Sequence, residues 1–167
     1  MNKGDGKLPN VSPAVSERPS GLSRPAYLQA AAVPWRPGEE GPEVLLISGR
    51  QPADSSWPIW ILPQGGVEPG QTPAEAAAAE AWEEAGVEGT IGPDPFTFYE
   101  YETGNGWCRV SVFRMRVEHE ARSWPEDGER SRQWLPWHEA IPIISGEALR
   151  DVLVRFHSGN SLNFPGF

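Results

Sequence analysis

The chain has little of what a disulfide scaffold, a membrane protein or a nucleic-acid binder needs. Its 167 residues include one cysteine, Cys108, so no disulfide forms within the chain, a usage that suits the cytoplasm. No apolar run reaches the ~18 residues of a membrane-spanning helix. A net charge of −9 repels nucleic-acid polymers and anionic membranes. We therefore expect one cytoplasmic main domain without either partner, while its oligomeric state stays open.

The two ends of the chain differ in composition from its middle. Residues 1–25 are rich in proline, serine and glycine and lack the continuous apolar segment of a secretory signal. Residues 158–167 have the composition of a frayed end. We predict a flexible tail over residues 1–25, the main domain over residues 26–157 and a second tail over residues 158–167.

The clearest local signal lies in a stretch without lysine or arginine, residues 51–108. Within it, Thr72, Pro73 and Glu75 form a capping-box pattern that starts a helix at about Pro73. Alanines follow and favour the helix, and Gly86 suits the left-handed residue that ends one. The sequence therefore predicts a short helix that stops just before this glycine.

Three carboxylates share one face of this predicted helix. Glu80, Glu83 and Glu84 are three and four residues apart, so their like charges repel, and they lie in the last turns, where the helix dipole disfavours anions. The stretch offers no basic residue to offset them and no histidine. A hard divalent cation with oxygen ligands, Mg²⁺ or Mn²⁺, is the compensation that we expect. Gly65 and Gly66 allow a tight upstream turn whose carbonyl oxygens can face the same metal.

The order of these residues resembles the Nudix hydrolase box, G-x5-E-x7-R-E-U-x-E-E-x-G-U, in which U is a bulky apolar residue. Aligned with the box, the chain begins at Gly65 and ends with Glu80, Ala81, Glu83, Glu84, Gly86 and Val87. The resemblance implies an α/β fold, the Nudix-type α/β/α sandwich with a mixed central β-sheet. It also implies metal ligation by Gly65, Glu80, Glu83 and Glu84, and general-base catalysis by Glu80 or Glu83.

Two box positions depart from the family pattern. Gln71 replaces the first glutamate, and Ala79 replaces the arginine. In the family that arginine helps to hold a metal-binding glutamate, a role whose loss costs ~10- to 100-fold in metal affinity or activity. Two alternatives follow: an active enzyme, or a catalytically weakened Nudix-fold module that binds a ligand or regulates. We expect Ala79→Arg to raise activity, unless another residue such as Arg50 already fills the place.

Apolar and β-branched segments on both sides of the box predict a sheet, and a later apolar periodicity predicts helices. We expect strands at 27–35, 43–48, 60–62, 97–102 and 109–117, and short helices at 137–144 and 147–157. The Gly104-Asn105-Gly106 segment is typical of a hairpin turn.

Arginine must bind any phosphate in the main domain, because both lysines, Lys3 and Lys7, lie in the predicted tail. Arg50 follows one predicted strand, and Arg109 begins another. The region from about Tyr27 to His157 resembles the diphosphoinositol polyphosphate phosphohydrolase branch of the family. The resemblance rests on a series of features in chain order: Trp60 with Pro63, Gly65 and Gly66, the EAGVEG segment after the helix, Arg109, Trp124, Arg130-x-Arg132-x-Trp134 and Glu139-Ala140-Ile141. That resemblance implies phosphate contacts by Arg109, Arg130 and Arg132.

The substrate class follows from the same resemblance. The expected reaction is hydrolysis of a pyrophosphate bond in a small phosphorylated substrate, with Mg²⁺ or Mn²⁺ as cofactor. The Leu-Pro-Gln-Gly-Gly start of the box resembles dinucleoside polyphosphate and RNA 5′-pyrophosphate hydrolases, and the few basic residues suit a highly phosphorylated inositol less well. We rank dinucleoside polyphosphates first and diphosphoinositol polyphosphates second, with ADP-ribose or an oxidised nucleotide behind.

Further residues are candidates for the site. Trp57 and Trp107 are candidates for stacking on a nucleobase. Glu100, Glu102 and Glu120 are further candidates for the general base of the reaction.

Overall fold

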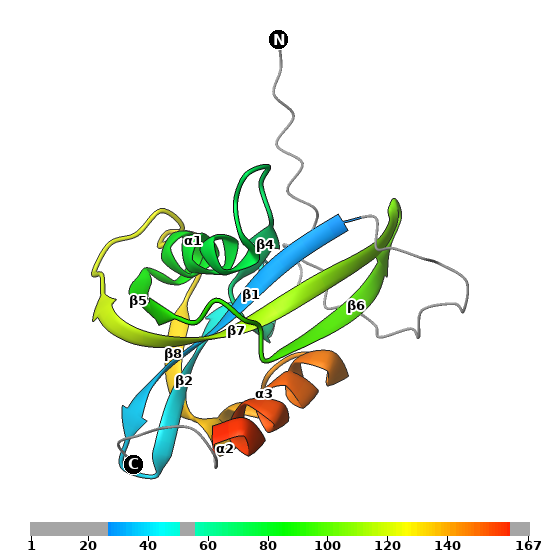
Figure 1. The fold of residues 1–167 in the computed structure, drawn as a ribbon. Helices are drawn as coiled ribbons and strands as arrows, with labels where there is room; N and C mark the ends of the chain where they lie inside the picture. Colours follow the sequence, from blue (N-terminus) through cyan, green and yellow to red (C-terminus); the bar gives the residue numbers. More distant parts are fainter. Residues whose placement is uncertain (1–26, 51–55, 161–167) are drawn as a thin grey trace.

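One mixed β-sheet with helices on both faces forms the core of the protein (Figure 1). The computed structural model describes residues 27–50 and 56–160. Its strands are β1 (Tyr27–Gly38), β2 (Gly41–Ser48), β3 (Trp60–Ile61), β4 (Gln64–Gly66), β5 (Val87–Ile91), β6 (Thr97–Thr103), β7 (Gly106–Glu120) and β8 (Arg132–Pro136). Its helices are α1 (Pro73–Ala85), α2 (Trp137–Ala140) and α3 (Glu147–Asn160). The predicted α/β fold with a mixed sheet is confirmed.

Strand β1 is the centre of the sheet. It pairs parallel with β7 and antiparallel with β2 and β4. The remaining pairs extend the sheet outward, with β3 and β8 on β2, and β5 and β6 on β7. Because both faces of β1 are covered, its middle residues Ala30–Val33 are fully buried. The predicted strand at 27–35 is therefore confirmed, and it continues to Gly38, where a tight turn leads into β2.

Helix α1 has the ends that its sequence predicts. The Thr72 hydroxyl accepts a hydrogen bond from the Glu75 amide at 3.1 Å, and the Glu75 carboxylate accepts one from the Thr72 amide at 2.8 Å. Gly86 ends the helix with φ of 65°, a left-handed conformation. A side chain at Gly86 would also overlap Trp124 and Arg132, so glycine is required here for space as well as for conformation.

Helix α1 lies close to the sheet because small residues meet at the contact. Ala76, Ala77, Ala81 and Ala85 are buried on the helix, and they pack on the alanine-rich middle of β1. A helix that packs through alanine approaches the backbone of the sheet more closely than one that packs through large side chains. This short separation brings the carboxylates of α1 to the backbone of β4.

The hairpin of β6 and β7 is confirmed, with Gly104 and Asn105 between the paired residues Thr103 and Gly106. Strand β7 is longer than predicted because it pairs with β1 and β6 over its first part and with β5 over its second. The short strands β4, β5 and β8 have no clear pattern of their own and were not predicted.

The last part of the described chain forms a helix of four residues, α2, and a longer helix of 14 residues, α3. The prediction of a helix at 137–144 is wrong beyond Ala140, because Pro142 cannot continue it and Ile144 bridges to Trp60. Helix α3 is confirmed and runs to Asn160, into the predicted C-terminal tail. Its apolar residues Leu149, Val152, Leu153 and Phe156 are buried. Residues 1–25 lie outside the described residues, and no described helix is long and apolar enough to cross a membrane.

Candidate functional site

Two carboxylates of α1 meet the glycine loop at β4. A Cβ atom at Gly65 would overlap the Glu80 carboxylate, so only glycine permits this approach. Glu84 is 1% exposed, and its Oε1 accepts a hydrogen bond from the Gln64 amide at 3.1 Å. The Glu80 and Glu84 carboxyl groups also share a hydrogen bond. The structure therefore brings together three of the four predicted metal ligands, Gly65, Glu80 and Glu84, while Glu83 lies exposed on the same helix.

The environment of Glu84 favours its neutral form. Burial raises the pKa of the Glu84 carboxyl above its usual value, and its hydrogen bond with Glu80 raises it further. The positive charge of Arg130 and the Gln64 amide oppose these effects only in part. Two carboxyl groups in contact repel each other when both are ionised, and a hard cation with oxygen ligands offsets that repulsion. The donor set fits a divalent cation of the Mg²⁺ type.

Arg130 lies behind this pair, buried inside the protein. Its side chain is 1% exposed, and its guanidinium forms an ion pair with Glu84. Its Nε donates to Glu126 at 3.1 Å, and its Nη1 donates to the Ser48 carbonyl at 3.0 Å. This environment does not fit the predicted contact with substrate phosphate, because all sides of the guanidinium that carry N–H groups face protein acceptors.

Arg132 is also held by the protein. Its Nη1 donates to the Ala85 carbonyl at 2.8 Å, its Nη2 donates to the Ala121 carbonyl at 2.5 Å, and its guanidinium carbon lies 4.0 Å from the centre of the Trp124 ring. A cation at a helix C-terminus offsets the dipole and satisfies end carbonyls. The geometry thus fits a cap on α1 and not the predicted phosphate contact.

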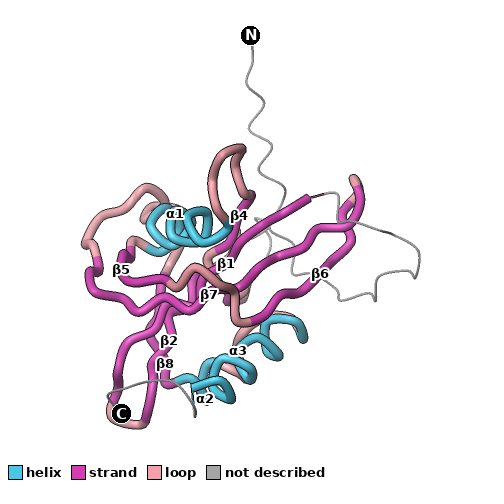
Figure 2. The backbone as a smooth tube through the Cα atoms, viewed as in Figure 1, coloured by secondary structure: helices cyan, strands magenta, loops and turns pink. Residues whose placement is uncertain are grey.

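The loop before β8 completes this cap, and Figure 2 shows it beside the end of α1. The Trp124 indole donates to the Glu84 carbonyl at 3.2 Å, and the Glu126 amide donates to the Glu83 carbonyl at 3.1 Å. Sequence reasoning found no basic residue near the acidic end of α1. The compensating groups come from residues 121–132, which tertiary packing alone brings there.

Arg50 and Arg109 remain accessible. The Arg50 side chain is 46% exposed, although its Nη2 lies 2.8 Å from Glu126 and 3.1 Å from Glu129. The Arg109 side chain is 37% exposed, with its guanidinium carbon 3.7 Å from the centre of the Phe98 ring. These two arginines keep the solvent access that binding of a phosphate requires.

An open cavity of about 450 Å³ lies next to Arg130. It is lined by Ser48, Gly49, Pro58, Asp127, Gly128, Glu129, Arg130 and Ser131. Two exposed carboxylates in this lining oppose a polyanion. Among the predicted base-stacking residues, Trp107 is buried and packs inside the fold, whereas Trp57 is 80% exposed and precedes the cavity residue Pro58.

A polar network behind β4 was missed by sequence reasoning. The Tyr99 hydroxyl donates to the side-chain oxygen of Gln64, and the side-chain nitrogen Nε2 of Gln64 donates to the side-chain oxygen of Gln29 at 3.0 Å. The Tyr101 hydroxyl also donates to Gln29, at 3.0 Å. Gln64 is thus anchored through its side chain while its backbone amide holds Glu84. The alternation Tyr-x-Tyr could have placed both tyrosines on one face of β6, but not opposite Gln64.

The two departures from the box have different surroundings. The Gln71 side chain accepts a hydrogen bond from the Glu68 amide at 3.0 Å, so it shapes the loop without needing a charge. Ala79 is half-buried and places no polar group near the carboxylates. The further base candidate Glu120 lies 3.2 Å from Arg132 and accepts from Trp134, and Glu100 lies 3.8 Å from Arg109.

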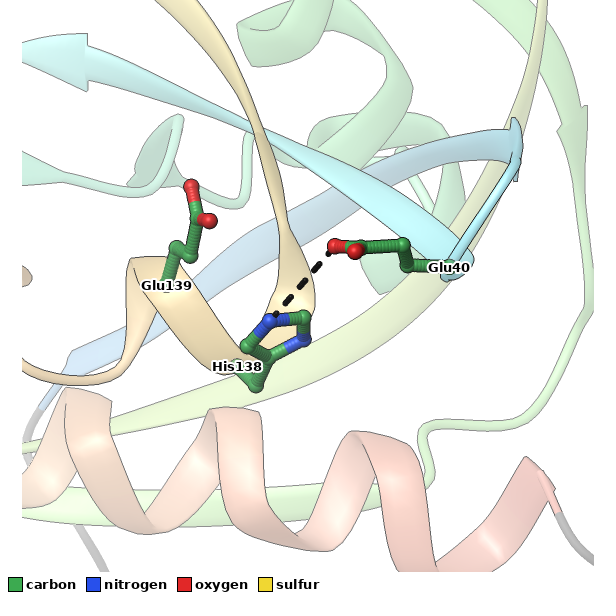
Figure 3. Close-up of side chains that lie close together, drawn as sticks. All are labelled: Glu40, His138 and Glu139. Carbon is green, nitrogen blue, oxygen red and sulfur yellow. Dashed lines mark ion pairs between the residues drawn. The ribbon is translucent and has the colours of Figure 1, made fainter.

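A second group of potential metal ligands lies beside the turn that precedes β2 (Figure 3). Glu40, in the turn before β2, faces His138 of α2 with 3.8 Å between the paired atoms, and Glu139 lies beside them. All three residues are exposed. This group is separate from the carboxylates of α1.

The mixed sheet, the glycine loop and the acidic helix define an α/β fold of the Nudix class. A family model described as NUDIX domain matches residues 27–156, and the chain belongs to this family.

Three known proteins illustrate the similarity. "Nudix hydrolase 16, mitochondrial" of Arabidopsis thaliana is 36% identical over 120 residues, which are 67% of this chain and 63% of that protein. "Diphosphoinositol polyphosphate phosphohydrolase 2" of Rattus norvegicus is 34% identical over 118 residues, 70% of this chain and 62% of that protein. The match thus spans less than two thirds of these relatives. The solved structure of a C. elegans Ap4A hydrolase binary complex has a TM-score of 0.62 and 22% identity, covers 81% of this chain and 98% of that one, and shows the shared fold.

Proposed function

We propose that this protein hydrolyses a pyrophosphate bond in a small phosphorylated substrate, with Mg²⁺ or Mn²⁺ held between α1 and β4. One observation carries the proposal: the Glu80 carboxyl group lies against Gly65 and contacts the Glu84 carboxyl group, which accepts from the Gln64 backbone amide. Two carboxyl groups in contact, one of them fully buried, cost stability unless a cation offsets their charge. A hydrolase of the Nudix family would bind such a cation.

The residues of the site have separate tasks. Glu80, Glu84 and the Gly65 carbonyl would hold the cation, which when bound offsets phosphate charge and lowers the pKa of the attacking water. Of the two predicted bases, Glu83 has the solvent exposure that contact with a water requires, whereas Glu80 is half-buried against Gly65. We assign proton acceptance to Glu83, with Glu80 as a metal ligand.

Arg50 and Arg109 are the proposed phosphate-binding residues. With Arg130 and Arg132 held by protein partners, the site has fewer basic groups than the sequence suggested. Two accessible arginines suit a short polyphosphate chain better than an inositol ring with many phosphates. This supports the ranking of dinucleoside polyphosphates before diphosphoinositol polyphosphates, and exposed Trp57 offers a surface for one base.

A second candidate function is ligand binding without efficient hydrolysis. Gln71 and Ala79 favour it, because each removes a charge that the family box carries. The buried carboxyl pair would then still bind a metal and a phosphorylated ligand.

One assay separates the two functions. Purified protein with Mg²⁺ or Mn²⁺ is tested against dinucleoside polyphosphates, diphosphoinositol polyphosphates, ADP-ribose and an oxidised nucleoside triphosphate. Glu83→Gln is the test variant, and Glu88→Gln, at an exposed glutamate on β5, is the matched control. We expect release of phosphate products by the wild type and by Glu88→Gln, and a strong loss in Glu83→Gln. Equal rates in all three proteins, or binding without turnover, would exclude the hydrolase.

A further inference from the structure

We infer that Arg130 takes over the task of the arginine that the box has lost at position 79. In this protein the positioning cation for Glu84 comes from the loop before β8 instead of from α1. The inference rests on the proposed function, since Glu84 acts as a metal ligand in it, but the geometry that carries it does not depend on a substrate.

The charge of Glu84 has to be balanced inside the protein. This carboxyl group is 1% exposed, and a buried carboxylate is stable only beside a cation or with strong hydrogen bonds. Neither α1 nor the whole of residues 51–108 contains a lysine or arginine. The buried guanidinium of Arg130 forms an ion pair with Oε2 of Glu84, whereas the Gln64 backbone amide donates to Oε1.

Arg130 is itself held in place by the protein. Its remaining N–H groups reach the Glu126 carboxylate at 3.1 Å and the Ser48 carbonyl at 3.0 Å. Glu126 in turn accepts from Arg50 at 2.8 Å, and its backbone amide donates to the Glu83 carbonyl at 3.1 Å. The planar guanidinium therefore bridges β2, the loop and α1 at fixed angles, which a lysine cannot do.

The network of contacts around Arg130 ends at the proposed metal-ligating face of α1. Arg50, Glu126, Arg130 and Glu84 form one series of alternating charges that runs from the surface into the site. Such outer partners orient a ligand for the metal, and their loss costs ~10- to 100-fold in metal affinity or activity. Of the two candidates for the empty place of the box arginine, Arg130 and Arg50, only Arg130 contacts Glu84 in the described residues; Arg50 supports it through Glu126.

The test measures Mg²⁺ and Mn²⁺ affinity of the full chain by titration without substrate. We expect Arg130→Ala to weaken affinity on the order of 10- to 100-fold and Arg130→Lys to weaken it less, because lysine keeps the charge but not the three contacts. Arg122→Ala, at an exposed arginine near the start of the same loop, is the matched control and should bind metal like the wild type.

Introducing an arginine at position 79 makes the test specific. In the wild type, Ala79→Arg should change metal affinity by less than about threefold, because Arg130 already supplies the cation beside Glu84. In the Arg130→Ala variant, the added Ala79→Arg change should restore at least about half of the lost metal affinity on a logarithmic scale. In the activity assay, Arg130→Ala should need more Mg²⁺ while kcat at saturating Mg²⁺ largely recovers. A merely structural role would lower kcat without changing the Mg²⁺ dependence.

Three results would overturn the inference. Unchanged metal affinity in a folded Arg130→Ala is one, and unchanged affinity with a raised KM for substrate is another, since it would make Arg130 a substrate contact. The third is a loss that Ala79→Arg does not reduce. If circular dichroism shows that Arg130→Ala is unfolded, Arg130→Lys and Glu126→Gln decide in its place, and wild-type metal affinity in both would contradict the inference. Absence of hydrolysis in every protein would remove the proposed function but leave the metal titration intact.

Discussion

The two long helices cover opposite faces of one sheet in different ways (Figure 1). Helix α3 packs through large apolar side chains, Leu149, Val152, Leu153 and Phe156, each at most 2% exposed. Helix α1 packs through alanines and buries a charged residue, Glu84, beside them. Large side chains contribute more free energy per residue, whereas alanines permit a close approach. The comparison indicates that α3 mainly stabilises the fold and that α1 mainly positions chemistry.

Glu84→Gln should have the largest effect on this comparison. It removes a buried metal ligand on α1, so we expect kcat/KM to fall by more than the ~100-fold that loss of an outer partner can cost. The melting temperature of the metal-free protein should fall only modestly, because the buried Arg130 guanidinium loses the charge of Glu84 but keeps its ion pair with Glu126. Steady-state kinetics and thermal unfolding together check this, with Glu88→Gln as the control. A large loss of stability would contradict the assigned division between the helices.

Leu153→Ala is the matching change on α3. Leu153 is fully buried, so truncation should lower the free energy of unfolding by about 2–5 kcal/mol through lost burial and a cavity. Activity of the folded fraction should stay within about twofold, because α3 lies on the face away from the carboxylates. Urea unfolding and kinetics below the transition measure both quantities. A specific loss of kcat would show that α3 also positions the site.

Ala77→Leu tests whether the close approach of α1 matters. Ala77 is fully buried against the sheet, and a larger side chain there should cost about 1–3 kcal/mol by overpacking. The helix should also shift away from β4, so we expect metal affinity to fall together with stability. Ala78→Leu, at a half-buried position of the same helix, is the control. Normal metal affinity in a destabilised Ala77→Leu would mean that the spacing is not critical.

The smallest expected effect is a pH dependence of metal stabilisation. The folded-state pKa of Glu84 is raised by burial, so the metal-free folded protein binds more protons than the unfolded chain between the usual carboxyl pKa and the raised one. Its contribution to stability is therefore present at low pH and is lost as pH rises through the raised pKa. Because Mg²⁺ replaces the proton, it should raise the melting temperature more at about pH 8 than at about pH 6. Thermal unfolding at both values checks this, and Glu84→Gln should show a smaller difference. An equal or larger rise at the lower pH would contradict it.

Interactions between residues close together in the sequence determine helix α1 and the placement of its carboxylates. Thr72, Glu75 and Gly86 define the ends of the helix through contacts within a few residues, and helical spacing places three carboxylates on one face. The family resemblance added the role of Gly65. Short strands such as β4 and β8 were missed because each forms only through its partner strand.

Only the tertiary structure decided how the charges of α1 are balanced. The sequence predicted that Arg130 and Arg132 bind phosphate. It does not show whether the side chain of an arginine near a strand faces solvent or the interior. Packing of the loop before β8 against α1 turns both inward, one to Glu84 and the other to the Ala85 carbonyl. These contacts join residues far apart in the chain, so no local pattern could reveal them. The sequence by itself determined which groups can bind a metal, and the fold decided which arginine holds them in place.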